Sequence, residues 1–220
     1  MKYRICLLIL ALLFFSENNY AQLQTGSCMY GGSFRIYGTS SVRSGESSID
    51  NNSWMLMPQL GWVIKPNVLI GVQLGITGYR YQYDLNQKTT MLGPAAGFFA
   101  RRYYPLSARW ALIAAGAFSG EYQSVQTKTI NGVLIGSVKG LNFSLTATPG
   151  ITFRAGKSIW LESQFDNLLR MGWGRQVSKT FDLSGTESSR VTNSQTVAEL
   201  NTPQLNSLVI GIRWILPPRK

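Results

Sequence analysis

An alternation of apolar and polar side chains runs along this chain and is clearest between Leu141 and Arg154. Every odd-numbered position from Leu141 to Phe153 is apolar, and every even-numbered position from Asn142 to Arg154 is polar or glycine. Because successive side chains of a β-strand point to opposite faces, this stretch predicts a strand with one apolar and one polar face. Strands of soluble β-sandwiches usually last about five or six residues. A longer unbroken alternation is typical of strands that cross a lipid bilayer.

Seven further segments carry the same pattern in weaker form, so that eight strands are predicted in all. The last segment, 208–216, alternates again, with Val209 interrupting its polar face. Small residues such as Gly97 and Ala115 lie on the polar, lumen-facing side of their strands. They suit a narrow barrel whose lumen is filled by larger side chains from other strands. The other predicted strands are 30–37, 54–64, 68–76, 92–104, 110–120 and 159–169.

The connections between these strands alternate between tight turns and longer polar loops. Outer-membrane barrels have short turns at the periplasmic end and longer loops outside the cell. The pattern therefore predicts an all-β fold: a closed, antiparallel, eight-stranded, up-and-down transmembrane β-barrel, with ten strands if the longest loop holds an extra hairpin. The tight turns lie at 65–67, 105–108 and 155–157, and the predicted extracellular loops at 38–52, 85–88, 123–136 and, longest of all, about 174–203.

The first residues have the features of an export signal. Two basic residues precede the eleven-residue apolar run Ile5 to Phe15, and the polar segment SENNYAQ follows it. This order of charged, apolar and cleavage-site regions is typical of a secretory signal peptide, and the run is shorter than the about 18 residues of a membrane-spanning helix. We expect a signal peptide over residues 1–21, cleaved after Ala21, and one barrel domain over residues 22–220.

Composition and charge fit a protein that faces lipid. Charged residues make up 14% of the chain, against roughly 25% in ordinary soluble proteins. The formal net charge is +11, but basic residues are scattered singly and no run exceeds Arg101-Arg102. A nucleic-acid site needs a clustered basic stripe, so we expect no nucleic-acid partner and attribute the charge to contact with anionic lipid headgroups or solutes.

The segment NNYAQ, the hairpin rhythm and the closing GIRWIL make the sequence similar to the small, porin-like outer-membrane β-barrels common in Bacteroidetes. The resemblance covers nearly the whole chain. It implies localisation in the cell outer membrane after signal-directed export, with outer-membrane lipid as surroundings. It also implies contact with the barrel-assembly machinery, for which Gly211, Trp214 and Leu216 match the terminal recognition signal. The sequence departs from the pattern in having PPRK after Leu216, where such barrels often end on Phe.

The residue types for common catalytic sites are missing. The sequence contains no histidine, which excludes Ser-His triads and most transition-metal sites. The glycine-rich segments GGSFRIYG and GLNFSLTATPG lack the phosphate-loop and dinucleotide fingerprints. We therefore expect no enzyme activity, no cofactor and no metal site.

Charged side chains on the predicted lumen faces form the candidate site. Charges inside a narrow barrel must be paired or hydrated. In one interpretation they form a structural salt-bridge network that plugs the barrel. In the other interpretation they gate a narrow pore. The excess of arginine in this pore makes it selective for small anions. The residues of this predicted lumen network are Arg35, Arg101, Glu121, Arg154, Glu162, Asp166 and Arg213.

Four functions fit these features. The leading hypothesis is a non-enzymatic outer-membrane barrel that acts as a structural or interaction scaffold, with extracellular loops contacting an extracellular or envelope protein partner. The Ser/Thr-rich stretch 179–201 carries most of that prediction, although it also fits a solvated loop. The alternatives are a narrow gated pore for small, preferably anionic solutes, a component of a protein-secretion apparatus, and a soluble lipocalin-like barrel with an apolar interior.

Overall fold

Strands make up nearly all of the chain that the computed structural model describes. In that part no helix is long and apolar enough to cross a membrane. The predicted signal peptide, 1–21, lies outside the described residues. These are 23–41, 49–84, 87–129, 131–165, 168–182, 184–201 and 208–218.

The described residues form ten strands, each antiparallel to its neighbours. The alternating segments form paired strands because pairing supplies hydrogen-bond partners to their backbone N–H and C=O groups. In a strand, the alternation also places the apolar side chains together on one face. The strands are β1 (Cys28–Ser41), β2 (Ile49–Lys65), β3 (Val68–Asp84), β4 (Gln87–Pro105), β5 (Trp110–Thr129), β6 (Leu134–Arg154), β7 (Ile159–Phe165), β8 (Leu169–Phe181), β9 (Glu187–Leu200) and β10 (Leu208–Leu216).

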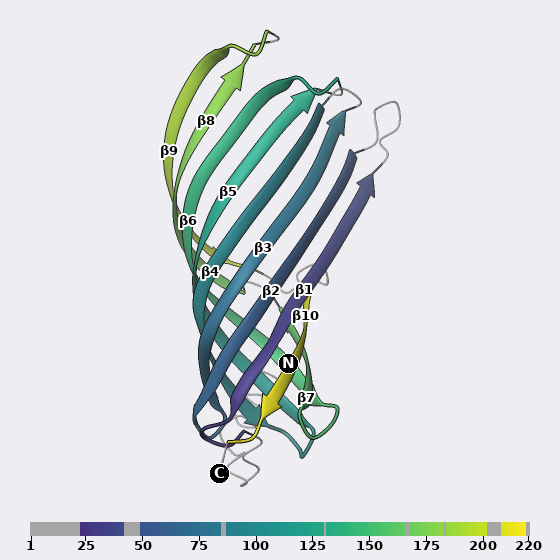
Figure 1. Ribbon diagram of the computed structural model, residues 1–220, viewed down its shortest axis with the longest axis vertical. Coiled ribbons are helices and arrows are strands. Elements are labelled where there is room, and N and C mark those ends of the chain that lie inside the picture. Colours follow the sequence, from purple (N-terminus) through teal and green to yellow (C-terminus); the bar gives the residue numbers. More distant parts are fainter. Residues whose placement is uncertain are drawn as a thin grey trace, which may run out of the picture.

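Eight of these strands close a ring. Hydrogen-bonded pairs run from β1 through β2, β3, β4, β5 and β6 to β7, then to β10 and back to β1. The ring lies at the end of the molecule that carries the tight turns, at the bottom of Figure 1, which we call the turn end. The opposite end is called the far end. The eight-stranded, up-and-down antiparallel barrel predicted from the sequence is confirmed.

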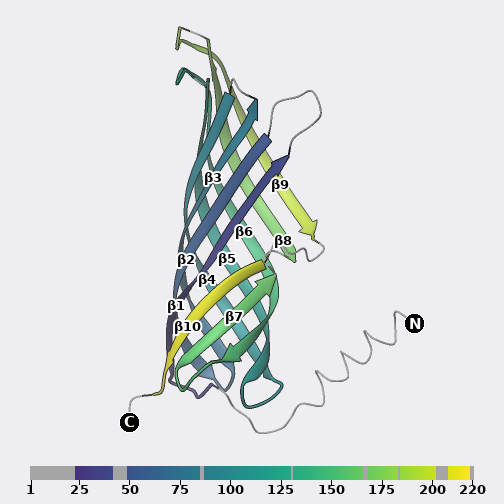
Figure 2. The ribbon, with the colours of Figure 1, turned by 90° about the vertical axis from the view of Figure 1, so that its right-hand side faces the viewer.

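The last two strands of the barrel are each broken in the middle. β6 pairs with β7 through Gly150–Arg154 and with β8 through Gly136–Ala147, so β8 continues the course of β7 along the same neighbour. β7 pairs with β10, and β8 pairs with β9. Figure 2 shows β7 and β10 side by side at the turn end, with β8 and β9 beyond them. Toward the far end the described strands form an open sheet edged by β1 and β9.

The prediction of a long loop over 174–203 is wrong, whereas the extra hairpin considered for it is present. Residues 174–181 belong to β8, and 187–200 form β9. The predicted loop 123–136 is also mostly strand, because β5 extends to Thr129 and β6 begins at Leu134. The error has a physical cause: apolar side chains in these strand ends are few and do not recur at every second position, as the adjacent Leu134 and Ile135 illustrate, so the alternation by which the other strands were predicted is absent.

The outer face of the barrel is apolar, whereas the inner face carries both polar and apolar side chains. On β2 the exposed side chains include Trp54, Leu56, Leu60, Trp62 and Ile64. This stretch is as long as the about 9–11 residues with which a tilted strand crosses a bilayer. The apolar exterior is the reverse of a soluble lipocalin-like barrel, and that alternative is wrong.

Exposed aromatic rings lie at both ends of this apolar outer surface, which we call the apolar belt. Near the turn end, Trp214 stacks on Tyr30 with ring centroids 6.0 Å apart, and Trp110 packs on Phe153 at 4.7 Å. Further along the strands, Trp173 stacks on Phe143 at 6.1 Å. Amphipathic rings at two levels are typical of the two headgroup regions of a membrane.

Beyond the belt, the central strands continue as a polar sheet. β4, β5 and β6 contain 19, 20 and 21 residues, about twice the number that spans a bilayer. On β5 the exposed positions after Tyr122 include Gln126 and Lys128. The far end of the barrel therefore projects out of the lipid, as the long upper strands of Figure 1 illustrate.

A packed apolar core fills the lumen at the turn end. The N-terminal described residue, Leu23, closes this end: its amide donates to the Asn67 side chain at 3.1 Å, and the Asn67 amide donates back to its carbonyl at 3.2 Å. A filled lumen matches the narrow barrel that was expected from the small residues on the lumen-facing side of the strands. The core residues are Leu23, Met29, Val63, Leu69, Phe99, Tyr103, Ala111, Ile113, Trp160 and Ile215.

Candidate functional site

A buried cluster of three charged side chains lies directly beside this core. Glu162 of β7 places its Oε2 2.8 Å from Nη1 of Arg101 on β4 and 3.1 Å from Nη2 of Arg213 on β10. Glu162, Arg101 and Arg213 are only 3%, 4% and 0% exposed. One carboxylate thus joins β4, across the lumen, to the neighbouring strands β7 and β10.

Neutral polar side chains complete the coordination of this carboxylate. Tyr103 donates its hydroxyl to Oε1 of Glu162 at 2.9 Å, and Gln164 donates to Oε2 at 3.0 Å. Arg101 also donates to Oε1 of Gln59 at 2.6 Å, and Gln59 donates to Gln73 at 3.1 Å. We call Arg101, Glu162, Arg213 and Tyr103 the plug. A buried ion pair is tolerated when hydrogen bonds satisfy its remaining groups, as they do for Glu162.

Arg213 is held in a folded-back conformation. Its Nη1 donates to the carbonyls of Gly32 and Ile212, and its Nη2 donates to Oγ of Ser33 at 2.6 Å. A Cβ at Gly211 would lie 2.8 Å from both terminal nitrogens of Arg213. Glycine at this position therefore makes the space that the guanidinium occupies.

The structure brings together three of the seven residues of the predicted lumen network: Arg101, Glu162 and Arg213. Glu121 lies apart from them, where its carboxylate accepts from Thr77 at 2.7 Å and from Gln123 at 3.0 Å. The prediction fails for Arg154, which donates to the carbonyls of Gly156 and Lys157 in the next turn, because it is the last residue of β6.

Two more predicted residues are placed differently. Arg35 lines the cavity on the far-end side of the plug, and Asp166 lies outside the described residues. Sequence reasoning missed Tyr103, Gln59 and Gln164, although all three fall on the inward phase of their strands. The alternation could have marked them as lumen residues, but it carries no information on which side chains meet. Gly211, Trp214 and Leu216 lie on β10, and their role in barrel assembly stays a prediction.

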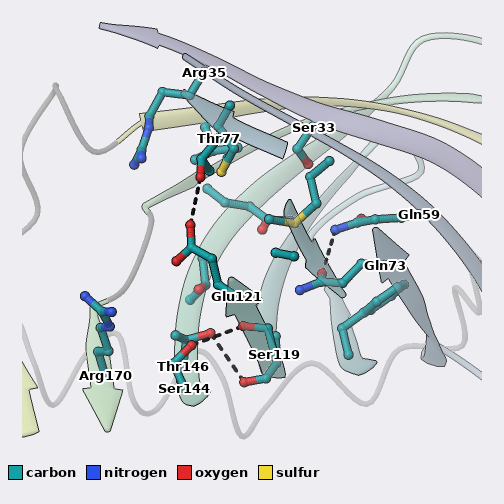
Figure 3. Close-up of a pocket in the computed structure, with 18 of the residues that line it drawn as sticks. Ser33, Arg35, Gln59, Gln73, Thr77, Ser119, Glu121, Ser144, Thr146 and Arg170 are labelled. Atoms are coloured by element: carbon teal, nitrogen blue, oxygen red, sulfur yellow. Dashed lines mark hydrogen bonds between the residues drawn. The ribbon is translucent and has the colours of Figure 1, made fainter. Parts of the chain in front are cut away.

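Between the plug and the far end the lumen opens into a cavity of about 470 Å³, which we call the cup. Arg101 and Gln59 contribute to its lining next to the plug. Figure 3 shows Arg35 and Arg170 on either side of Glu121, across from Gln59 and Gln73. Most of the remaining lining is hydroxyl-bearing or apolar and small, including Ser33, Ser53, Thr77, Ala115, Ala117, Ser119, Ser144, Thr146 and Thr148.

The closed ring, the apolar belt and the filled turn end define a transmembrane β-barrel with a blind-ended polar cup. No protein-family model and no curated protein matches the sequence.

Several solved structures have a similar shape, and their sequence identities to this chain are low. Neisserial surface protein A is 12% identical, with a TM-score of 0.39 over 86% of this chain and 97% of that chain. A major outer membrane protein from Thermus thermophilus is 9% identical, with a TM-score of 0.44 over 86% and 99%. The translocator domain of autotransporter NalP from Neisseria meningitidis is 9% identical, with a TM-score of 0.40 over 97% and 96%. Nothing about the role of this chain follows from likenesses at this level.

Proposed function

We propose that this chain is a non-enzymatic, non-conducting barrel of the bacterial outer membrane that acts as an interaction scaffold, with β9 as its partner-binding element. An apolar band between two levels of aromatic rings supports the outer-membrane assignment, because it is the surface of outer-membrane barrels. The core and the plug, which fill the lumen at the turn end, support the absence of a through-going channel. The observation that carries the proposed role is the outer edge of β9.

Between its bulge near Ser188 and Glu199, β9 is an edge strand without the usual protection. Within the described residues β9 pairs only with β8, and all its residues except Val197 are exposed. The eight residues from Val191 to Ala198 contain no charge, no proline and no glycine. Natural proteins blunt exposed edges with lysine, proline or bulges, because an unpaired edge is a template for another strand. We infer that β9 keeps an open edge for a partner.

The partner that fits this edge is an extended polypeptide segment outside the membrane. Thr196 lies opposite Trp173 at the far-end aromatic level, so residues 187–195 of β9 lie on the far-end side of the apolar belt. Open sheet edges do not occur in the hydrocarbon region. Strand addition takes its affinity from main-chain hydrogen bonds and its register from side chains. Arg190 and Glu199 flank the uncharged stretch, so an antiparallel partner carries a basic residue opposite Glu199 and an acidic residue opposite Arg190.

A designed peptide can take the place of the natural partner in a binding test. The probe is the labelled peptide Lys-(Thr-Val)₄-Glu, and the control peptide has proline at its two central positions. Fluorescence anisotropy with the barrel in lipid nanodiscs should show saturable binding of the first peptide only. The variant Thr196→Lys should weaken binding, whereas Gln126→Lys, on a strand paired on both sides, should not. Equal binding of both peptides, or of neither, contradicts the proposal.

The gated pore is the second candidate, because charged rather than apolar side chains cross the lumen at the plug. It predicts ion current through the refolded barrel in a planar bilayer, with a preference for chloride. We expect no current from the wild type or from Glu162→Ala, since the apolar core remains below the plug. A current that appears in Glu162→Ala would favour the pore. The secretion-apparatus alternative predicts copurification with other envelope proteins after mild detergent extraction.

A further inference from the structure

A row of aromatic rings crosses the outer face of β4, β5, β6 and β8. Phe118 stacks on Phe143 with ring centroids 6.2 Å apart, and Phe143 stacks on Trp173 at 6.1 Å. Phe98 continues the row on β4, since it lies opposite Phe118 in the β4–β5 ladder. We call these four residues the ridge. The ridge stands above the small residues that lie beside it on the lipid-facing surface.

On the far-end side of the ridge, these small residues leave a groove. Ala96 of β4 and Gly120 of β5 lie directly opposite each other in its lining, and Tyr122 and Leu141 line it toward the far end. Apart from Gln73 and the hydroxyl of Tyr122, the lining is apolar. The groove has a volume of about 580 Å³, within the roughly 300–1,000 Å³ of small-molecule sites. Because it faces lipid, the ligand that fits it is a hydrocarbon chain.

Two exposed cations lie next to the groove, just beyond the apolar belt. Arg175 of β8 is directly opposite Leu141 of the groove and is the next outward residue after Trp173. Lys139 of β6 is the next outward residue after Leu141. We call Lys139 and Arg175 the basic pair. Diagonal neighbours on one face of a sheet are about 7–8 Å apart, so both side chains can reach the same phosphate group.

The basic pair has no carboxylate partner on the described strands around it. No ion pair joins Lys139 or Arg175 to an acidic side chain in the part of the chain that the structure describes. Glu187, near the far end of β9, is paired with Lys179 at 2.5 Å. The turn between β8 and β9 contains Asp182, whose carboxylate accepts hydrogen bonds within that turn.

The other acidic residues between positions 110 and 200 lie elsewhere. Glu121 and Glu162 face the lumen, and Glu199 shares the inner face with Arg170, its partner in the β8–β9 ladder. Asp166 lies outside the described residues and precedes β8, whose first residue is about 20 Å along the strand from the basic pair. The basic pair is therefore a local excess of positive charge, which attracts anions.

The groove rises toward the basic pair. The strands lean as they rise, as Figure 1 shows, and hydrogen-bonded rows run across antiparallel strands at a right angle. The row of the groove therefore slopes upward from β3 to β6. A lipid has its charged headgroup at the membrane surface and its chains below. A lipid chain in the groove thus leads to a headgroup beside β6 and β8, where the basic pair lies.

We propose that this outer face binds an anionic, phosphate-bearing lipid of the leaflet at the far end, with one acyl chain in the groove and the phosphate between Lys139 and Arg175. Lysine and arginine both bind phosphate, and arginine does so through a planar pair of donors. The site is on the outer surface and does not use the open edge of β9. It is therefore independent of the proposed scaffold role.

Native mass spectrometry of the refolded barrel in detergent micelles tests the proposal. Phosphatidylglycerol is the anionic probe, phosphatidylcholine with the same chains is the neutral one, and inorganic phosphate is the anion without a chain. We expect one retained phosphatidylglycerol per barrel, bound at least about tenfold more tightly than phosphatidylcholine and not displaced by millimolar phosphate. No retained phosphatidylglycerol, equal affinity for both lipids, or displacement by phosphate overturns the proposal.

A matched pair of variants tests the basic pair. Arg175→Gln removes one of its two cations, whereas Lys128→Gln removes an exposed cation of β5 nearer the far end, opposite Leu134. Arg175→Gln should weaken phosphatidylglycerol binding at least about fivefold, and Lys128→Gln should leave it within about twofold. Equal affinities of these two variants contradict a phosphate site at the basic pair.

A second pair of variants tests the groove. Ala96→Phe fills the groove, whereas Ala114→Phe adds the same ring at an exposed alanine of β5 that does not line it. Ala96→Phe should weaken phosphatidylglycerol binding at least about fivefold, and Ala114→Phe should leave it within about twofold. Equal affinities of these variants contradict an acyl chain in the groove. Heat-dependent mobility in gels verifies that all four variants are folded.

Discussion

Arg213 reaches Glu162 by folding back over the residue that lies directly opposite this carboxylate in the β7–β10 ladder. That residue is Gly211, and a side chain there would occupy the place of the guanidinium. The ion pair of 3.1 Å therefore depends on a glycine as much as on its two charges. Since the pair lies in the ladder that connects the end of the chain to the ring, it stabilises closure of the barrel.

Gly211→Ala should destabilise the barrel by about 1–3 kcal/mol, because the new methyl group forces Arg213 out of its position. The free energy of unfolding in urea, measured in phospholipid vesicles, checks this. Gly116→Ala is the control, since a Cβ at Gly116 meets its nearest neighbour, the carbonyl of Thr146, at 3.7 Å. A loss of stability no larger than in the control would show that the guanidinium has room elsewhere.

Glu162→Gln should cost about 3–5 kcal/mol of unfolding free energy, because it leaves Arg101 and Arg213 buried without their shared anion. The matched variant Glu187→Gln removes the carboxylate of the 2.5 Å pair with Lys179, whose side chains are about one-third exposed. A surface pair contributes about 1 kcal/mol or less, so this change should be small. Similar unfolding free energies for the two variants would mean that water or an ion already compensates the plug.

The alternation along the chain was sufficient to predict the ring. Side chains that face lipid must be apolar and those that face a narrow lumen can be polar or small, so the two kinds alternate along each strand. It placed Arg101, Glu162 and Arg213 on inward faces for the same reason. It could not predict that Tyr103 and Gln164 share the carboxylate of Glu162, because side-chain reach across the lumen leaves no local pattern.

Two of the sequence-based predictions were wrong for reasons that lie in the local surroundings of the residues. The hairpin of β8 and β9 was predicted as a loop because water borders both faces of β9, and no period of two remains in its sequence. Arg154 occupies an inward-facing position but is the last residue of β6, where it donates to the turn carbonyls of Gly156 and Lys157. Alternation therefore predicts the strand segments within lipid better than the segments beyond it.

The turn between β8 and β9 is organised by one carboxylate. Asp182 accepts from the Ser184 hydroxyl at 2.6 Å and from the Thr186 amide at 2.8 Å, and these bonds hold the pKa of Asp182 below its ordinary value. Because the folded-state pKa lies below the unfolded value of about 3.9, the carboxylate stabilises the turn above that pH. This contribution is lost as the pH falls through the folded-state pKa.

Carbon-13 NMR titration of the Asp182 carboxyl group checks this. Ser184→Ala should raise its pKa toward the ordinary value, since the largest stabilising bond is removed. Ser188→Ala is the control, because this hydroxyl donates to the Thr180 carbonyl in the same hairpin and does not contact Asp182. An unchanged pKa in Ser184→Ala would assign the shift to the backbone amides.

Two positions on the same face of β5 define where the lipid ends. Phe118 is 49% exposed in the apolar belt, opposite Phe98 and Leu145, whereas Gln126 lies on the same face toward the far end. An arginine on the lipid face costs about 2–4 kcal/mol at the bilayer midplane and about 0–1 near the interface. Phe118→Arg should therefore lower the unfolding free energy in vesicles by about 2–4 kcal/mol, and Gln126→Arg should change it little. Equal losses at both positions would mean that the belt extends farther along β5 than its apolar side chains indicate, and that the polar sheet does not project from the membrane.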